Sequence, residues 1–183
     1  GIEENSKKIV IQPLKIPELK VPKYVIFKEK AAPTSKEPHE VAFSIITEIL
    51  SRIIDTEGPI HYEEIGRRYA TTLGKSRAGA RILARVQQVL KRLGKAGEYV
   101  ENDDFWSTIS QYDSPPVRNR SLMSAGIIKG HYIPPAEIKA AADLIIKQSG
   151  EVEKEDLIKA IGKLLGFKRV GPDLNSAFSD ALR

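Results

Sequence analysis

The sequence predicts a mainly α-helical fold with a small β-hairpin, built as two helix-turn-helix units of which only the first carries the hairpin. Apolar residues recur at helical spacing in several segments. A short pattern over residues 98–106 is typical of a hairpin, and the pattern of residues 60–90 returns 92 residues later. We expect four parts: an extended N-terminal arm or linker (1–37), a first unit (38–107), an irregular connector (108–133) and a second helix-turn-helix unit (134–183).

The first helix-turn-helix is predicted between residues 60 and 95. Ile65, Tyr69 and Leu73 recur every four residues, which is one face of a helix that Gly74 ends. A second helix is expected to begin near Gly79. Its apolar stripe has helical spacing and comprises Ile82, Val86, Val89, Leu90 and Leu93.

A hairpin is predicted to follow this pair of helices. Residues 98–101 and Phe105-Trp106 have strand character and flank a turn at Asn102-Asp103. Ile60 is expected to add a short strand. This layout is that of a winged-helix domain, in which the second helix of the pair commonly enters the major groove and the hairpin touches the nucleic-acid backbone or minor groove. Trp106 is expected in the core, the alternative being a base-stacking role.

The remaining segments are assigned from proline positions and periodicity. Prolines make residues 1–37 extended, so they form either a partly ordered linker or an arm along a surface, such as one of another part of the protein. A helix is predicted over 38–57, starting at Pro38, and further helices over 134–149, 154–165 and from about 172. Residues 114–120 contain Ser-Pro-Pro-Val-Arg-Asn-Arg and are expected to form a connector or a strap.

The repeat preserves apolar and glycine positions but not charge. Gly74 corresponds to Gly166, and Leu73 to Leu165, so both copies should build the same frame. The basic positions change, since Arg81 becomes Asp173, Arg85 becomes Ala177 and Gln88 becomes Asp180. Because carboxylates repel phosphates, we assign nucleic-acid contact to the first copy and expect the second to pack or to dock on a protein.

Basic residues are concentrated in the first helix-turn-helix, where residues 61–95 hold nine Lys or Arg against two Glu. Spacings of four, three and four place several of them on one helix face. The predicted nucleic-acid-binding residues are Lys75, Arg77, Arg81, Arg85, Gln88, Lys91 and Arg92. A secondary basic set comprises Arg118, Arg120, Lys168 and Arg169. The alternative is an ordinary solvated helix face.

Composition excludes several classes of function. The chain has 183 residues, a net charge of +5 and no cysteine, which excludes disulfides and thiolate metal sites and fits a reducing cytoplasm. No apolar run approaches the roughly 20 residues that cross a bilayer. Three scattered histidines show no ligand spacing, and His61 is expected to cap a helix or lie on the surface. We expect no catalytic residue, metal, cofactor, membrane or small-molecule substrate. Because the chain begins at Gly1, we expect it to be part of a longer protein.

Several motifs together resemble a bacterial domain of unknown function. They are Ile60-His61, the turn of residues 74–81 (GKSRAGAR), Phe105-Trp106, residues 115–121 (PPVRNRS), residues 133–137 (IPPAE) and residues 165–171 (LGFKRVG). That domain lies at the C-terminal end of very large helicase-like proteins of superfamily one, which also carry a restriction-endonuclease-like domain. The resemblance implies an accessory module without catalytic activity. The phosphate-binding loop of an ATPase is absent from this sequence.

Two hypotheses remain open. In the first, the chain is a non-catalytic module that binds DNA or RNA for a helicase- or nuclease-like parent. In the second, it is a protein-docking module that positions the helicase and nuclease domains of the same parent, with the basic face meeting an acidic partner. An enzyme in its own right is poorly supported.

Overall fold

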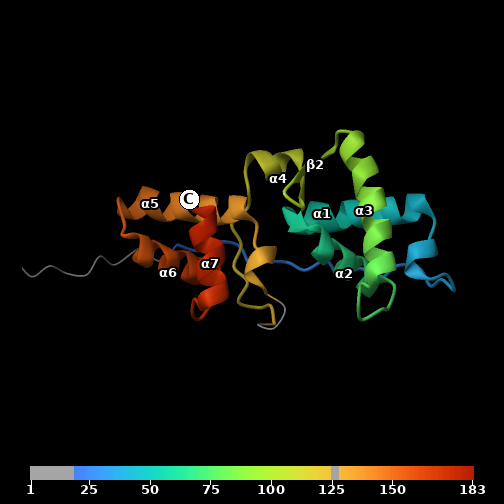
Figure 1. Cartoon of the computed structure of the whole chain (residues 1–183), viewed down its shortest axis with the longest axis horizontal. Helices are drawn as coiled ribbons and strands as arrows, with labels where there is room; N and C mark the ends of the chain where they lie inside the picture. The colour runs from blue at the N-terminus through green and yellow to red at the C-terminus, as the bar shows by residue number, and fades with distance from the viewer. Residues whose placement is uncertain (1–18, 125–127) are drawn as a thin grey trace, which may run out of the picture.

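The computed structural model describes residues 19–124 and 128–183 and is mainly helical, with a small antiparallel sheet (Figure 1). The helices form two groups that lie side by side along the long axis of the molecule. Helices α1 to α3 and the sheet form the first group, and α5 to α7 form the second (Figure 1). Each group has its own hydrophobic core, so the two groups are held together by the segments that join them and not by a shared core.

The first group begins with the short 3-10 helix η1 (Pro38–Glu40), followed by α1 (Phe43–Glu57), α2 (Tyr62–Thr72) and α3 (Ala80–Lys95). The continuous helix predicted over 38–57 is wrong at its start, because the backbone is extended at Val41 and Ala42. Two contacts hold this break in place. Val41 is buried in the first core, and the Tyr69 hydroxyl donates a hydrogen bond to the Pro38 carbonyl at 2.5 Å.

Three short strands complete the first group. The central strand, β3 (Phe105–Thr108), pairs antiparallel with both β1 (Ile60–His61) and β2 (Tyr99–Asn102). Ile60 lies opposite Trp106, as expected for a strand at Ile60. Trp106 is 7% exposed and belongs to the first core, which agrees with the core role predicted for it.

The predicted irregular connector contains two short helices, α4 (Ile109–Asp113) and η2 (Gly130–Tyr132). A capping box explains the first of them. The Thr108 hydroxyl accepts a hydrogen bond from the Gln111 N–H, and the Gln111 side chain accepts one from the Thr108 N–H. The Gln111 amide also donates to the Ile54 carbonyl at 2.9 Å, which ties α4 to the end of α1.

The second group consists of α5 (Pro135–Ser149), α6 (Lys154–Leu164) and α7 (Pro172–Ala181). Its elements follow those of the first group at an offset of 92 residues. Both ends of η2, α5 and α6 match those of η1, α1 and α2, and the starts of α7 and α3 match in the same way. Gly74 and Gly166 have left-handed φ angles of 79° and 90° at the ends of α2 and α6. The structure therefore extends the repeat to α1 and α5, which precede α2 and α6.

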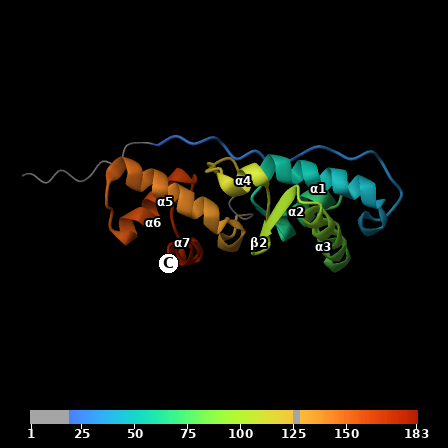
Figure 2. The same cartoon turned by 90° about the horizontal axis from the view of Figure 1, so that it is seen from above.

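The described part of the N-terminal arm, residues 19–37, runs extended along both groups (Figure 2). Leu19 and Val21 pack against the second core, and Phe27 is buried in the first. Between them, Lys23 forms a parallel bridge with Asn119 of the connector. The surface that this segment follows is therefore that of its own chain. Residues 1–18 of the predicted arm lie outside the described residues.

Candidate nucleic-acid interface

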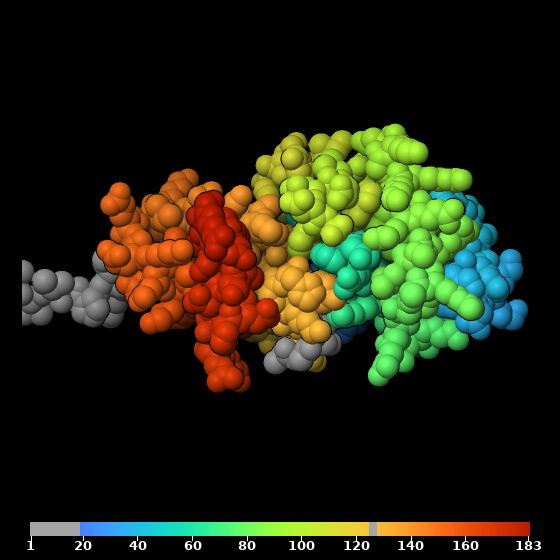
Figure 3. Space-filling model, in the orientation of Figure 1, coloured from blue at the N-terminus to red at the C-terminus, as the bar shows by residue number. Residues whose placement is uncertain are grey.

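Helix α3 presents its polar side to solvent because its apolar stripe is buried. Val86, Val89 and Leu90 are fully buried in the first core, and Leu93 is 7% exposed. Figure 3 shows α3 at the surface of the first group, on the side away from the second group. The predicted binding residues other than Arg85, which is half-buried, are exposed; they are Lys75, Arg77, Arg81, Gln88, Lys91 and Arg92. We call these seven residues the basic surface.

Part of the basic surface is arranged around an aromatic ring at the start of α1. The guanidinium carbon of Arg92 lies 4.2 Å from the centroid of the Phe43 ring, and that of Arg85 lies 5.5 Å from it. Arg85 Nη1 also donates a hydrogen bond to Gln88 Oε1 at 2.9 Å. These two arginines therefore lie on the flank of α3 that faces α1, whereas Gln88 and Lys91 occupy more outward positions.

Few cations of the basic surface form ion pairs within the described residues. Within residues 19–124 and 128–183, only Lys75 of this set has a carboxylate within 4.0 Å, the exposed Glu37 at 3.9 Å. An exposed pair at this separation contributes little to stability. The positive charge is therefore left unneutralised by the described part of the protein, which is the condition that phosphate binding requires.

The start of α3 places backbone hydrogen-bond donors beside these positively charged side chains. Gly79 occupies the N-cap position without a side-chain cap, and the first turn holds no acidic residue. The backbone N–H groups of this turn have no intrahelical partner, and such groups suit an anion. Arg81 lies in the same turn, and Lys75 and Arg77 lie in the loop just before it.

The second copy uses the corresponding positions differently. Asp173, which corresponds to Arg81, accepts a hydrogen bond from the Gly130 N–H at 2.7 Å and so fastens η2 to α7. Pro38 stands at the position of Gly130 in the first copy, and proline has no N–H to donate. The first copy has no such N–H group, so the residue at this position, Arg81, does not need to accept a hydrogen bond.

Of the secondary basic set, Lys168 and Arg169 are exposed in the loop before α7 and Arg118 is half-buried, but the prediction that Arg120 adds to the positive surface is wrong. Arg120 is 5% exposed and forms a bidentate ion pair with Glu137, which is 1% exposed. Arg118 Nη1 donates to the Glu57 carbonyl at 2.8 Å, at the C-terminal end of α1. Both arginines thus fix the connector to helices, and the buried Arg120 is not available to a ligand.

The hairpin offers no positive contact at its tip. Glu101, Asp103 and Asp104 are all exposed there, and Asp103 and Asp104 form the turn with φ angles of 48° and 70°. Clustered carboxylates repel phosphate oxygens. These carboxylates therefore disfavour the expected contact between the hairpin and a nucleic-acid backbone, and the candidate surface is confined to α3 and the loop that precedes it.

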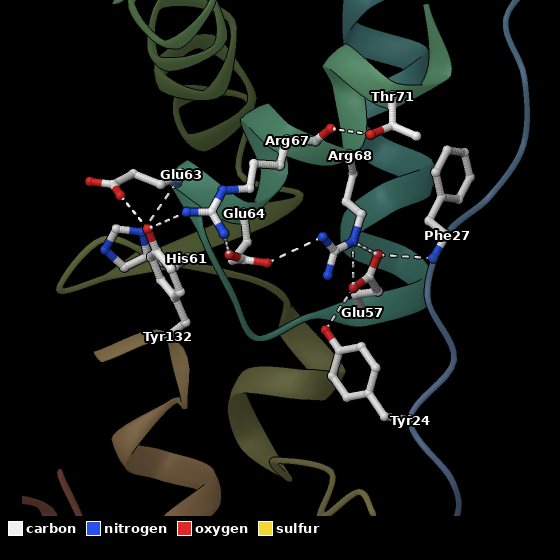
Figure 4. A network of polar contacts seen from close by, with 10 residues as sticks. All are labelled: Tyr24, Phe27, Glu57, His61, Glu63, Glu64, Arg67, Arg68, Thr71 and Tyr132. Atoms are coloured by element: carbon white, nitrogen blue, oxygen red, sulfur yellow. Dashed lines mark hydrogen bonds and ion pairs between the residues drawn. The ribbon is translucent and has the colours of Figure 1, made fainter. Parts of the chain in front are cut away.

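A network of polar and charged groups, buried at its centre, joins the two repeats, and sequence patterns did not indicate it (Figure 4). Its centre is Glu57, whose side chain is fully buried. That carboxylate accepts hydrogen bonds from the Tyr24 hydroxyl at 2.7 Å, from the Phe27 N–H at 2.9 Å and from Arg68 Nε at 2.9 and 3.1 Å. Burial, reinforced by Glu57, raises the pKa of Tyr24. The arm is thus held to α1 and α2 through one carboxylate.

The network continues from α2 to the second repeat. Glu64 pairs with Arg68 at 3.2 Å and with Arg67 at 2.7 Å. Arg67 donates to the Tyr132 hydroxyl at 3.0 Å, and that hydroxyl donates to Glu63 at 2.6 Å. Burial and the Glu63 carboxylate raise the pKa of Tyr132 to about 12. We call these seven residues the junction network: Tyr24, Glu57, Glu63, Glu64, Arg67, Arg68 and Tyr132.

His61 caps α2 beside this network, which confirms one of the two placements expected for it. Its Nδ1 accepts a hydrogen bond from the Glu63 N–H at 3.1 Å. Its ring lies 5.2 Å from that of Tyr132 and 6.2 Å from that of His131. Burial lowers the pKa of His61. Within the described residues, no group of three His, Asp or Glu side chains is arranged to hold a metal ion.

A small cavity lies at the junction, with a volume of about 30 Å³. Tyr24, Glu64, Arg68, Arg120 and Tyr132 are among the residues that line it. Apolar residues, among them Ile60, Ile128 and Ile133, line the rest of it. In residues 19–124 and 128–183, no helix is long and apolar enough to cross a membrane.

Comparison with known proteins yields one similarity. The sequence model of a family described as "Protein of unknown function (DUF3320)" matches residues 36–84. This span runs from the end of the arm through α1 and α2 to the first turn of α3, and so includes Phe43 and Arg81. No curated protein and no solved structure matches the chain. Residues 36–84 thus resemble a domain whose function is unknown.

Proposed function

We propose that the chain is a non-catalytic accessory module that binds nucleic acid through the basic surface of its first repeat. In this proposal, α2 and α3 form the helix-turn-helix of a winged-helix unit, and the parent protein is a helicase- or nuclease-like enzyme. The observation that carries the proposal is the row of basic side chains on α3 and its preceding loop, of which only Lys75 has a carboxylate within 4.0 Å among the described residues.

The dimensions of α3 suit a duplex. Arg81 and Arg92 are separated by about 16 Å along a helix that rises 1.5 Å per residue. An α-helix fits the major groove of B-DNA, which is about 12 Å wide. Gln88 and Lys91, on the outward side, would approach base edges. Arg85 and Arg92, on the flank, and Arg81, in the first turn, would contact phosphates, which contribute most of the affinity and no direct sequence information.

The second repeat supports this assignment as an internal reference. It builds the same helices at an offset of 92 residues while Asp173, Ala177 and Asp180 replace the polar positions of α3. The shared frame therefore does not require Arg81, Arg85 or Gln88. Exposed residues that a frame does not require are candidates for binding.

The role in a parent protein rests on the resemblance of several motifs to a domain of helicase-like proteins. A module without its own catalytic site would tether such an enzyme to its substrate. The competing role, a protein-docking module, would use the same basic surface against an acidic partner. The two roles predict different ligands for the basic surface, nucleic acid in the first and an acidic protein in the second.

Fluorescence anisotropy with a labelled 20-base-pair DNA duplex tests the proposal. We expect Arg81→Ala with Arg85→Ala to weaken binding at least tenfold, because two phosphate contacts are lost. The matched control is Lys139→Ala with Lys163→Ala, which removes the same charge from exposed positions of the second repeat and should change affinity less than twofold. Equal effects of the two double variants would refute the proposed surface. Displacement of the duplex by polyglutamate at equal charge concentration would support docking to an acidic protein instead.

A further inference from the structure

The ring of Phe43 connects α1 to the basic surface. It lies under the guanidinium of Arg92, 4.2 Å from the guanidinium carbon, and is approached by that of Arg85 at 5.5 Å. Arg85 Nε is buried and has no hydrogen-bond partner within the described residues. The position of Arg85 therefore depends on the ring and on its hydrogen bond to Gln88 rather than on a carboxylate.

The repeat shows that the helical frame does not need this arrangement. Phe43 corresponds to Pro135 at the start of α5, and Arg85 corresponds to Ala177. The second repeat forms α5, α6 and the start of α7 at the same offset without an aromatic ring or an arginine at these positions. Phe43 is itself only half-buried at the edge of the first core. Its contribution to the core is one that another apolar residue of similar size could supply.

Stacking has a specific consequence for a guanidinium. The aromatic face attracts the cation, and the N–H groups point outward in the plane of the guanidinium, so they stay free to donate. A planar set of donors matches two oxygens of a phosphate. Because a long side chain loses rotamer freedom on binding, holding it in place beforehand reduces the entropy lost.

We propose that Phe43 is a positioning residue, which holds Arg92 with its N–H groups directed to the phosphodiester backbone of a bound nucleic acid, while Arg85 packs beside the same ring. This inference rests on the proposed function and adds to it the element that pre-orders the phosphate contacts. It also assigns a role to a residue of α1, outside the helix-turn-helix itself.

A double-mutant cycle between Phe43 and Arg92 tests the inference, with anisotropy of the labelled duplex as the measurement. Phe43→Leu keeps an apolar side chain and should weaken binding about fivefold, whereas Phe43→Tyr keeps a ring and should stay within twofold of the unchanged protein. Arg92→Ala should cost less in the Phe43→Leu background than alone, because the ring acts through the arginine. The dependence of affinity on salt should be the same for Phe43→Leu and the unchanged protein, since no charge is removed.

Three outcomes would overturn the inference: additive effects of the two substitutions, a Phe43→Tyr variant as weak as Phe43→Leu, or a Phe43→Leu variant that binds normally. Circular dichroism and urea denaturation verify that each variant folds. If Phe43→Leu does not fold, Arg92→Lys replaces it. That variant keeps the ring and the charge but loses the planar stack, and it should weaken binding more than Arg81→Lys, whose arginine is not on the ring; equal losses would overturn the inference. Absence of duplex binding by the unchanged protein would instead refute the proposed function.

Discussion

The carboxylate of Asp173 accepts a hydrogen bond from the backbone N–H of Gly130 at 2.7 Å, which joins the first turn of α7 to the short helix η2. The first repeat has Arg81 and Pro38 at these two positions, and proline offers no N–H. One repeat therefore uses the start of its third helix to hold its own fold. In the first repeat, the corresponding position is occupied by the exposed Arg81.

This difference predicts different effects on stability. Asp173→Ala should lower the free energy of unfolding by about 1 kcal/mol, because the Gly130 amide loses its acceptor. Arg81→Ala should change it by less than about 0.5 kcal/mol, as surface substitutions generally do. Urea denaturation followed by circular dichroism measures both. Asp180→Ala is the control on the same helix, since Asp180 is exposed and pairs only with Arg183 among the described residues. If Asp173→Ala were as harmless as Asp180→Ala, the structural role of Asp173 would be wrong.

The fully buried carboxylate of Glu57 predicts a much larger loss. It accepts hydrogen bonds from Tyr24, from the Phe27 N–H and from Arg68. Glu57→Ala should lower the free energy of unfolding by about 3 to 5 kcal/mol, since Arg68 keeps only one of its two carboxylate partners and several donors lose their acceptor. Tyr24→Phe removes one hydrogen bond and should cost about 1 kcal/mol.

Glu57→Ala also tests whether this carboxylate holds the N-terminal arm in place. Hydrogen exchange at the Phe27 amide should accelerate in Glu57→Ala, because that amide donates to Glu57. Glu48→Ala serves as the control, since Glu48 is an exposed residue of the same helix in an exposed pair with Arg52. Unchanged exchange at Phe27 in Glu57→Ala would show that the carboxylate does not hold the arm.

His61 predicts a dependence of stability on pH. Its Nδ1 accepts the hydrogen bond that caps α2, so the neutral ring is the form that fits. Burial lowers the pKa of His61, with smaller contributions from His131 and Arg67, while Glu63 and Asp104 oppose the shift. The unfolded chain, with a pKa of about 6.5 at this residue, therefore binds the proton more readily. The stabilisation is present above that pKa and is lost as the pH falls through and below it.

Urea denaturation at pH 7.5 and pH 5.5 tests this dependence. His61→Asn keeps an N-cap that does not titrate in this range, so its stability should fall less on acidification than that of the unchanged protein. Burial raises the pKa of Glu64, which gives a slope of the opposite sign, but Glu64 is present in both chains and its effect cancels in the comparison. The same loss of stability in both chains would exclude His61 as the cause.

Periodicity and glycine positions predicted the main helices of both repeats, because each helix buries one apolar stripe against its neighbours, but they missed the break at Val41 and Ala42. The hairpin followed from an equally local pattern, whereas the strand at Ile60 was expected from the winged-helix layout. The ion pair between Arg120 and Glu137 could not be predicted from such local patterns. They are separated by 17 residues and meet only because the connector packs on α5. An arginine in a proline-rich segment has the same sequence signature whether it is exposed or paired in the interior.

Glu57 and Phe43 illustrate the same limit. Glu57 ends an apolar helix, where a carboxylate would ordinarily face solvent, and it is buried because partners from the arm and from α2 converge on it. Phe43 was part of a predicted helix without a role of its own. The contact of its ring with Arg85 and Arg92 depends on how α1 packs against α3. Local patterns thus predict the frame, whereas the environment of each polar side chain depends on tertiary packing.

The salt dependence of duplex binding tests the central claim most directly. If the six cations of the basic surface neutralise phosphates, the logarithm of the association constant should fall with the logarithm of salt concentration with a slope of about −5. Replacing Arg81, Arg85 and Arg92 with alanine should reduce the slope to about −3, since each lost phosphate contact changes it by about 0.9. The same slope in both proteins, or no measurable binding at low salt, would contradict the account.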